Sequence, residues 1–468
     1  MNFEEQLHDE LDLMSRTSPA APSWKEFAPR AHRRLRARRA LAATAAGLIA
    51  ALAVPAYLAL GSEGERRGSQ IVNPDQRRGT VAEACRPTTA EQPGGRGEVA
   101  ALRGNTLYRV DVESGSQKVL AEGLPLRGGE PIRWSSSGAW IALDGRFVVA
   151  ASAGEVCAPL SERAHGLTWS PTRDELAGIV EGVVRTTTPE RDQDELSVRL
   201  DGPATGVAFD PEGERIAATT FRRRGASPKT ESGLFVVDAR TAESTEIVQG
   251  RSVDRLQLAG WSPDGEWILF WRMFAASESL NADGGPLFAV PASGGDPVKI
   301  TDWMLPRREL LSDCGESLAL TVGGGRSISS GKTVVRTGPP GWAIGDPFGL
   351  ERKSTFWPGC TSDGRLAATA TSNQDESPFG TLPRSVVIER PGQAPLEIDG
   401  FEYPVWVGEE DALLAVERER GPRADATLVL IDDLGPDAAR RPVFDLGALQ
   451  SSYGGVAYSE RFDYRAPD

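Results

Sequence analysis

The chain has 468 residues and a formal net charge of −14 at pH 7, and 40% of its residues are hydrophobic, which is ample for a closed core. The first 39 residues hold eight basic and six acidic side chains, so the remainder holds 44 basic and 60 acidic ones and carries a net charge of −16. This acidic body argues against nucleic acid and anionic lipid as partners, because both require a basic surface.

The chain begins with two short segments whose apolar residues recur at helical spacing, separated by the helix-breaking stretch TSPAAPS. The residues of the two apolar faces are Phe3, Leu7, Leu11, Met14, Trp24 and Phe27. Neither segment has a core of its own in which to bury such a face. Two interpretations stay open: a helix on a membrane surface or partly disordered tail, and a helix that docks into the groove of a partner.

Residues 40–60 (ALAATAAGLIAALAVPAYLAL) carry no charge, and a helix of this length crosses a hydrocarbon core of roughly 30 Å. Six arginines lie in residues 30–39 just before it, and glutamates open the segment after it. The positive-inside rule therefore places residues 1–39 in the cytoplasm as a head, and everything after about residue 61 outside the cell. The alternative is a cleaved signal peptide, but such leaders have a shorter charged region and a shorter apolar core. The sequence favours a single-pass membrane anchor.

This layout of an acidic amphipathic head, a Ser/Pro break, a Trp-containing segment, an arginine cluster and an Ala-rich span resembles actinobacterial single-pass proteins often associated with extracytoplasmic-function sigma factors. The resemblance covers about 60 residues and implies a sigma factor, or another signalling protein, as a partner of the head. The head departs from the zinc-binding pattern of many anti-sigma domains, because it contains His8 and His32 but no cysteine.

Residues 61–97 are rich in Gly, Pro, Arg, Glu and Thr with little periodicity, which predicts a flexible linker. In residues 98–468 a ten-residue phrase then recurs, most fully as WSPDGEWILF. Its copies begin at Trp134, Trp169, Phe209, Trp261, Leu311, Cys360 and Trp406. Six copies place an aliphatic residue seven positions after the first residue, and the Cys360 copy reaches Leu366 one position earlier. The copies start 35 to 52 residues apart, in or near the range of one four-stranded blade of a β-propeller.

The phrase has the physical properties of such a blade. The first residue, which we call the anchor, is expected to end an inner strand and to pack against the neighbouring blade. Ser-Pro-Asp-Gly is expected to form a tight turn, and the apolar run after it is expected to form the next strand of the sheet. The strand-like run 107–115 has no anchor before it, and Tyr453–Ser459 reads as an anchor-like strand with nothing after it. We therefore expect the two ends to share one blade, which closes the ring and removes its edges. The count is eight blades, or seven if one element is degenerate.

The repeated phrase resembles the WD-repeat-like propeller repeat of the TolB type over roughly residues 98–460. The resemblance implies an all-β propeller of seven or eight four-stranded blades whose repeats are scaffolding and carry no catalytic residue. Members of that family bind proteins, peptides or small ligands on the propeller faces, or hold a separate catalytic domain. Cys85, Cys157, Cys314 and Cys360 all lie on the predicted outside, where disulfides persist, and their pairing stays open.

A search for catalytic chemistry finds near misses. Residues 323–333 (GGGRSISSGKT) resemble a phosphate-binding loop but have Arg326 where glycine is required, and a strand-like run follows. His165 has no second metal ligand nearby, and residues 281–285 (NADGG) fit a hairpin better than a calcium loop. We therefore expect no enzyme activity, no cofactor and no metal. The predicted function is a membrane-anchored extracytoplasmic module that binds a protein, peptide or cell-envelope ligand; the alternative is a sensor that regulates a partner of the head.

Overall fold

The computed structural model describes residues 85–467, except for residues 87, 127–130, 161–163, 191–195, 224–229, 252, 276–280, 328–330, 351–352, 373–383, 391, 409–410, 419–422, 436–437 and 451–457. The chain divides into two units, Met1–Arg78 and Gly79–Asp468, and the described residues all belong to the second. The predicted head, with its apolar residues Phe3 to Phe27, and the predicted span at residues 40–60 lie outside them. Within the described residues, no helix combines the length and the apolar character that a membrane crossing needs.

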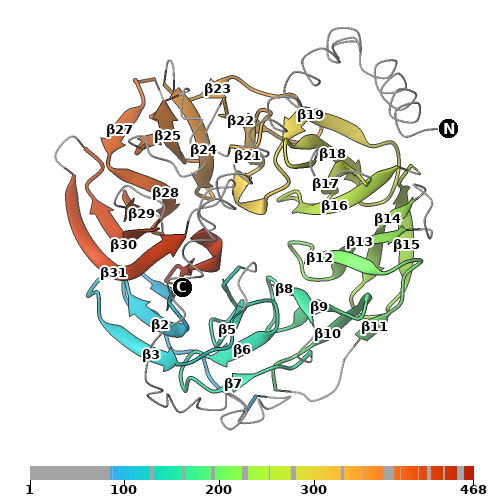
Figure 1. Cartoon of the computed structure of the whole chain (residues 1–468), viewed down its shortest axis with the longest axis horizontal. Coiled ribbons are helices and arrows are strands. Elements are labelled where there is room, and N and C mark those ends of the chain that lie inside the picture. The colour runs from blue at the N-terminus through green and yellow to red at the C-terminus, as the bar shows by residue number, and fades with distance from the viewer. Residues whose placement is uncertain are drawn as a thin grey trace, which may run out of the picture. The chain divides into compact units, whose positions relative to one another are not determined.

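The described residues form eight four-stranded antiparallel sheets arranged as a ring (Figure 1), so the prediction of an all-β propeller is confirmed with the higher blade count. The strands of each blade are named below in order from the channel to the rim. Blade 1 holds β32 (Phe462–Arg465), β1 (Glu98–Arg103), β2 (Thr106–Asp111) and β3 (Gln117–Ala121). Blade 2 holds β4 (Arg133–Trp134), β5 (Trp140–Leu143), β6 (Phe147–Ala150) and β7 (Val156–Cys157). Blade 3 holds β8 (His165–Trp169), β9 (Leu176–Val180), β10 (Val183–Thr187) and β11 (Leu196–Val198).

The remaining blades follow in chain order. Blade 4 holds β12 (Ala204–Phe209), β13 (Arg215–Arg223), β14 (Thr230–Asp238) and β15 (Ser244–Gln249), and blade 5 holds β16 (Asp254–Trp261), β17 (Trp267–Phe274), β18 (Gly285–Pro291) and β19 (Val298–Met304). Blade 6 holds β20 (Leu311–Cys314), β21 (Ser317–Val322), β22 (Thr333–Thr337) and β23 (Pro347–Phe348). Blade 7 holds β24 (Lys353–Cys360), β25 (Leu366–Ser372), β26 (Arg384–Ile388) and β27 (Leu396–Asp399). Blade 8 holds β28 (Phe401–Trp406), β29 (Ala412–Arg418), β30 (Arg423–Asp432) and β31 (Ala439–Gln450).

The repeated phrase forms the turn between the first and second strands of a blade. In blade 5, Trp261 ends β16 and pairs with Ile268 on β17. Ser262 Oγ accepts a hydrogen bond from the Trp267 amide at 3.0 Å, and Gly265 closes the turn with a φ of +69° that a side chain would disfavour. The same seven-residue offset pairs the anchors of blades 2, 3, 4 and 8 with their partners. Cys360 pairs with Leu366, as its shorter offset predicts.

The tryptophan anchors join each blade to the one before it through the indole N–H. Each Nε1 donates to the carbonyl oxygen of the residue that precedes the anchor position in the preceding blade. The pairs are Trp134 with Asp463 at 3.1 Å, Trp169 with Arg133 at 3.1 Å, Trp261 with Ala208 at 3.0 Å and Trp406 with Gly359 at 3.1 Å. The preference for tryptophan at this position therefore has a polar cause in addition to packing.

Replacing Trp261 with phenylalanine tests this hydrogen bond. The ring still fills its site, but the Ala208 carbonyl loses its donor, so we expect the free energy of unfolding to fall by about 1–3 kcal/mol. Trp303 is 50% exposed on the outer strand β19, and its replacement by phenylalanine is the matched control, expected to stay within about 0.5 kcal/mol. Urea denaturation measures both values, and equal effects of the two substitutions would contradict the role of the indole.

The prediction that Leu311 is the anchor of blade 6 is wrong. Leu311 begins β20 and pairs with Leu320, whereas Leu318, its expected partner, pairs with Asp313. The reason is a shorter turn: only Gly315 and Glu316 separate the paired residues Cys314 and Ser317. Cys314 ends the strand instead and forms a disulfide with Cys360 in blade 7, with a Cα–Cα distance of 5.0 Å. A covalent bond thus joins blades 6 and 7, whose strands β20 and β24 both end in cysteine.

The two ends of the chain do close one blade, but through other residues than those predicted. The closing strand is β32, whose residues Phe462 to Arg465 pair with β1. Residues 453–457 of the predicted strand Tyr453–Ser459 are not described, and Tyr458 begins the short helix η3 (Tyr458–Glu460). The prediction is wrong for Tyr458 and Ser459, because both are buried in this short helix and do not pair with a strand.

Residues 85–97, at the end of the predicted linker, are attached to the ring. Cys85 is buried and forms a disulfide with Cys157 on β7, with a Cα–Cα distance of 5.4 Å. Thr88 Oγ1 lies 2.5 Å from Ser152 Oγ, and the Cys85 amide donates to the Pro189 carbonyl at 2.7 Å. The chain therefore joins the propeller at the rim of blades 2 and 3.

Candidate binding site in the central channel

Aromatic residues from blades 7, 8 and 1 fill one side of the central channel. The inner strands β24 and β28 each contain a bulge, between Phe356 and Gly359 and between Glu402 and Val405. Trp357 and Tyr403 lie in these bulges with φ angles of +51° and +56°, a region that bulky residues seldom occupy. Each lies three positions before an anchor and is followed by a proline, so FWPGC and EYPVW share a sequence signal that was not used in the search for repeats.

These rings contact one another and the C-terminal segment. The Tyr403 ring lies 5.7 Å from Trp357, 5.0 Å from Tyr458 and 5.7 Å from Phe462, measured between centroids. Such tilted and edge-on pairs are the favoured aromatic geometries. In Figure 1 the red helix next to the C-terminus lies inside the ring, on the side of blades 8 and 1. This side of the channel is therefore closed by a packed aromatic cluster.

A buried charge cluster lies behind these rings. Glu402 on β28 is 3% exposed and accepts from Arg418 Nε at 3.0 Å, and it also pairs with Arg384. The Tyr458 hydroxyl donates to the same carboxylate. Burial raises the pKa of Tyr458 to about 12, and the two arginines act against this shift. The hydroxyl is therefore a neutral donor that helps to satisfy the carboxylate.

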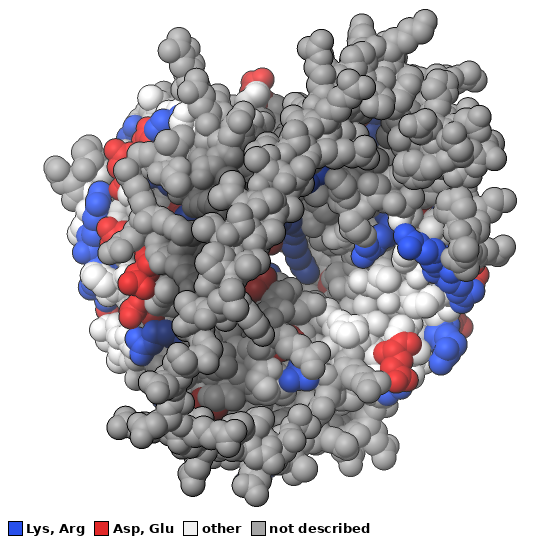
Figure 2. Space-filling view, viewed as in Figure 1, with Lys and Arg blue, Asp and Glu red and all other residues white. Residues whose placement is uncertain are grey.

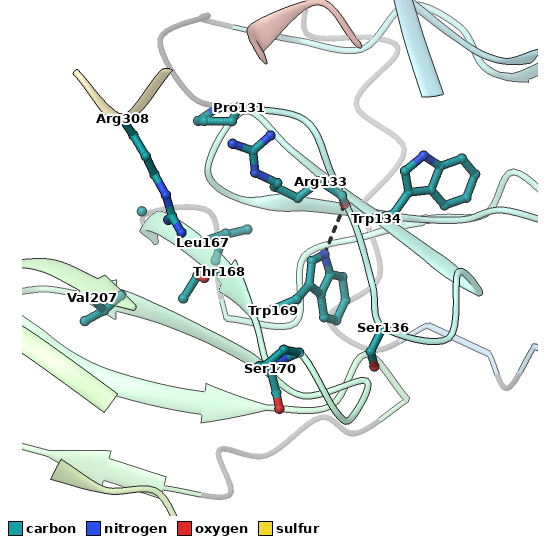
Figure 3. Close-up of a pocket in the computed structure, with 12 residues that line it drawn as sticks. Pro131, Arg133, Trp134, Ser136, Leu167, Thr168, Trp169, Ser170, Val207 and Arg308 are labelled. Atoms are coloured by element: carbon teal, nitrogen blue, oxygen red, sulfur yellow. Dashed lines mark hydrogen bonds between the residues drawn. The ribbon is translucent and has the colours of Figure 1, made fainter. Parts of the chain in front are cut away.

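The other side of the channel holds a cavity of about 370 Å³ between the inner strands of blades 2, 3 and 4 and the helix η2 (Arg308–Leu310), which connects blades 5 and 6 (Figure 3). Trp134 and Trp169 border it, together with Ser136, Thr168 and Ser170 as polar groups. The residues with apolar side chains that line it are Pro131, Leu167, Pro171 and Val207. A cavity of this size that combines apolar walls with a few convergent polar groups is the usual form of a small-ligand site.

Two arginines reach into this cavity from different parts of the chain. Arg133 extends from β4, and Arg308 extends from η2 toward Leu167 and Thr168 (Figure 3). Arg133 Nη1 lies 3.5 Å from Asp463 Oδ1 and donates to the Ile132 carbonyl at 3.1 Å. Among the residues that the structure describes, none forms a hydrogen bond or an ion pair with the Arg308 guanidinium, which is exposed to solvent inside the channel.

Burial and, to a smaller extent, the surrounding charges shift the pKa values of Arg308 and Asp463 in opposite directions. The dense protein environment lowers the pKa of Arg308, the positive charge of Arg133 lowers it further, and Asp313 acts in the other direction. Burial raises the pKa of Asp463, against which Arg133 and the Trp134 amide act. The Trp134 amide donates to Asp463 Oδ2 at 3.0 Å, so this carboxylate is held in place from two sides. Asp313 thus offsets part of the positive charge of Arg308, although none of the described residues forms an ion pair with it.

Figure 2 shows basic and acidic side chains interspersed over the described part of this face, and both kinds at the central opening. The positive character of the cavity is therefore local. It stands out in a chain whose residues beyond 39 carry a net charge of −16.

The sequence-predicted anchors are only partly at this site. Trp134 and Trp169 line the cavity, whereas Phe209, Trp261, Leu311, Cys360 and Trp406 are not among its lining residues. Arg133 and Arg308 were not predicted as site residues. A signal existed for Arg133, because it directly precedes an anchor and so lies on an inner strand near the channel. No signal marks Arg308, which lies in a connection between blades.

Three other sequence motifs serve the fold. Lys332, the lysine of the phosphate-loop-like stretch, is 2% exposed and donates to the carbonyls of Gly323, Gly324 and Gly325 at 2.7 to 2.9 Å. Burial lowers its pKa to about 8, and the strand β22 follows it, as predicted. The Asn281 side chain bonds to the Phe274 backbone and closes the hairpin between β17 and β18. His165 begins β8 and is exposed.

Comparison with known proteins supports the fold alone. No protein-family model matches the chain, and no curated protein does. The solved structure of Porphyromonas gingivalis dipeptidyl peptidase 4 is similar with a TM-score of 0.51 at 12% identity, over 79% of this chain and 60% of that one. A eukaryotic initiation factor aligns with a TM-score of 0.48 at 12% identity, over 83% and 93% of the two chains. The Vibrio parahaemolyticus oligogalacturonate lyase aligns with a TM-score of 0.41 at 12% identity, over 69% and 95%.

These similarities correct one expectation. The sequence predicts no enzyme activity, because it contains no recognised catalytic motif and its repeats resemble scaffolding. A propeller like this one forms part of a chain that is a dipeptidyl peptidase, and the similarity spans less than two thirds of that peptidase. The prediction that the protein is not an enzyme is therefore wrong as an inference from this fold, because the same architecture is found within enzymes.

Proposed function

We propose that the protein is a membrane-anchored extracytoplasmic binding module whose propeller recognises a protein, peptide or cell-envelope ligand in the central channel. The observation that carries the proposal is the uneven filling of the channel. Blades 7, 8 and 1 close it with aromatic rings, whereas blades 2 to 4 leave the cavity of about 370 Å³ with two arginines. A cavity of this size with apolar walls and convergent polar groups has the usual form of a ligand site.

The proposed organisation follows the sequence. Residues 1–39 form a cytoplasmic head, residues 40–60 a transmembrane helix, residues 61–97 a linker and residues 98–468 the propeller. The uncharged span after an arginine cluster supports the anchor and its orientation. Two disulfides in the propeller region are consistent with an oxidising compartment.

A cavity-filling variant tests the proposal. Thr168→Trp places an indole in the cavity, and Thr241→Trp places the same side chain in an exposed turn as the matched control. Full-length protein and both variants are captured from their native membrane, and the bound molecules are identified by mass spectrometry. We expect a ligand shared by the native protein and the Thr241 variant to be lost from the Thr168 variant. If the Thr168 variant retains every ligand, the channel is not the binding site.

The alternative function is a sensor that controls a cytoplasmic partner, such as a sigma factor, through the head. The two apolar faces of residues 1–39 favour this alternative, because a docking helix presents such a face to a groove. Deleting residues 1–28 tests it. A cytoplasmic regulator lost only from the deletion variant would support the sensor. An unchanged set of partners would support a binding module without a regulatory role of the head.

A further inference from the structure

We propose that the channel cavity binds a monoanionic organic ligand, with its carboxylate between Arg133 and Arg308 and its apolar body against Leu167 and Val207. This inference rests on the proposed function, because it specifies the ligand of the same cavity. It concerns the chemical class that these residues recognise, and a peptide with an apolar C-terminal residue is an example of that class.

The first argument is the charge balance of the cavity. Arg133 and Arg308 are close enough for the positive charge of one to act on the other. Arg133 has a carboxylate partner in Asp463, but within the described part of the chain the Arg308 guanidinium has none. An anion between the two guanidinium groups would relieve their repulsion and provide the charge-assisted hydrogen bonds that Arg308 lacks.

The second argument concerns the magnitude of the charge. Asp463 Oδ1 lies 3.5 Å from Arg133 Nη1, and Asp313 acts on Arg308, so two carboxylates offset part of the positive charge of the two arginines. A phosphate group carries a charge of about −1.5 to −2 and would be repelled more strongly by these carboxylates than a singly charged carboxylate. A carboxylate also matches the planar fork of a guanidinium group.

The third argument concerns the rest of the ligand. Pro131, Leu167, Pro171 and Val207 supply apolar walls, and Val207 is 8% exposed on the inner strand β12. The hydroxyls of Ser136, Thr168 and Ser170 are the smaller polar groups available. An apolar ligand body would exclude water from these walls, while the hydroxyls and the two guanidinium groups bind its polar end.

The experiment compares N-acetylleucine with N-acetylleucinamide, in which an uncharged carboxamide replaces the carboxylate. Binding to the full-length protein in detergent is followed by isothermal titration calorimetry and by the intrinsic fluorescence of tryptophan, since Trp134 and Trp169 border the cavity. We expect the carboxylate to bind more tightly than the amide, and Arg308→Gln to weaken the carboxylate about 10- to 100-fold while leaving the amide unchanged. Arg240→Gln, at an exposed turn, is the matched control and should change neither.

The outcomes separate the inference from the function on which it rests. Equal affinity for the carboxylate and the amide would overturn the anion site but keep a binding cavity. An Arg308→Gln variant that still prefers the carboxylate would also overturn it. Inorganic phosphate or glucuronate that displaces N-acetylleucine at lower concentration than N-acetylleucine itself would overturn the choice of a monoanion with an apolar body. If neither N-acetylleucine nor its amide binds and Thr168→Trp loses no captured ligand, the proposed function fails as well.

Discussion

Replacing Glu402 with alanine is expected to lower the free energy of unfolding by about 3–5 kcal/mol, among the largest effects of any single substitution in the propeller. Glu402 is 3% exposed and is the shared partner of Arg384, Arg418 and the Tyr458 hydroxyl. Its removal leaves two guanidinium groups of like charge in a region from which water is largely excluded. Burying a charge without its partner costs far more than the pair itself contributes.

Two further variants define what the measurement means. Tyr458→Phe removes one donor to the same carboxylate but no charge, so its expected cost is smaller, about 1–3 kcal/mol. Glu214→Ala removes a carboxylate from the exposed pair with Arg240 and is expected to stay within about 0.5 kcal/mol. Urea denaturation gives all three values. A Glu402→Ala cost no greater than that of Glu214→Ala would mean that the charge cluster does not stabilise the propeller.

Deleting residues 462–468 is expected to open the ring and make the protein aggregate. The deletion removes β32, the inner strand of blade 1, and so leaves the backbone of β1 without its partner from Glu98 to Ala101. It also removes Phe462, which is 3% exposed, and Asp463, which accepts from both the amide and the indole of Trp134. An unpaired edge strand next to exposed apolar surface is a template for association between chains.

Size-exclusion chromatography with light scattering measures the expected shift to higher mass, and thermal denaturation measures the expected loss of stability. Deletion of residues 466–468 is the matched control, because it keeps β32 complete. Adding a synthetic peptide of residues 458–468 should restore the monodisperse protein by supplying the missing strand from outside the chain. A truncated protein that stays monodisperse with an unchanged melting temperature would show that β32 is dispensable for closure.

The repeated phrase predicted most of the propeller because its information is local. A tight turn with Pro and Gly, an aromatic anchor and an apolar residue seven positions later are properties of neighbouring residues, and they located the first hairpin of blades 2, 3, 4, 5 and 8. The same reasoning failed for Leu311, where a turn of two residues changes which residues face each other. It also misplaced the closing strand. Tyr458, which was expected to lie in that strand, lies in η3 and packs against the aromatic rings of the channel, and β32 closes the blade.

The channel site was beyond the reach of the sequence for a physical reason. Arg133 and Arg308 are 175 positions apart, and only the circular arrangement of the blades brings a strand of blade 2 opposite the connection between blades 5 and 6. The same holds for Glu402, whose partners come from β26, β29 and η3. The sequence by itself determined the fold class, the blade repeat and the expectation of a membrane anchor, since each depends on short-range patterns of apolar and turn residues. The tertiary structure alone decided which side of the channel is filled, which cysteines pair and which charges meet, because those contacts depend on the closure of the whole ring.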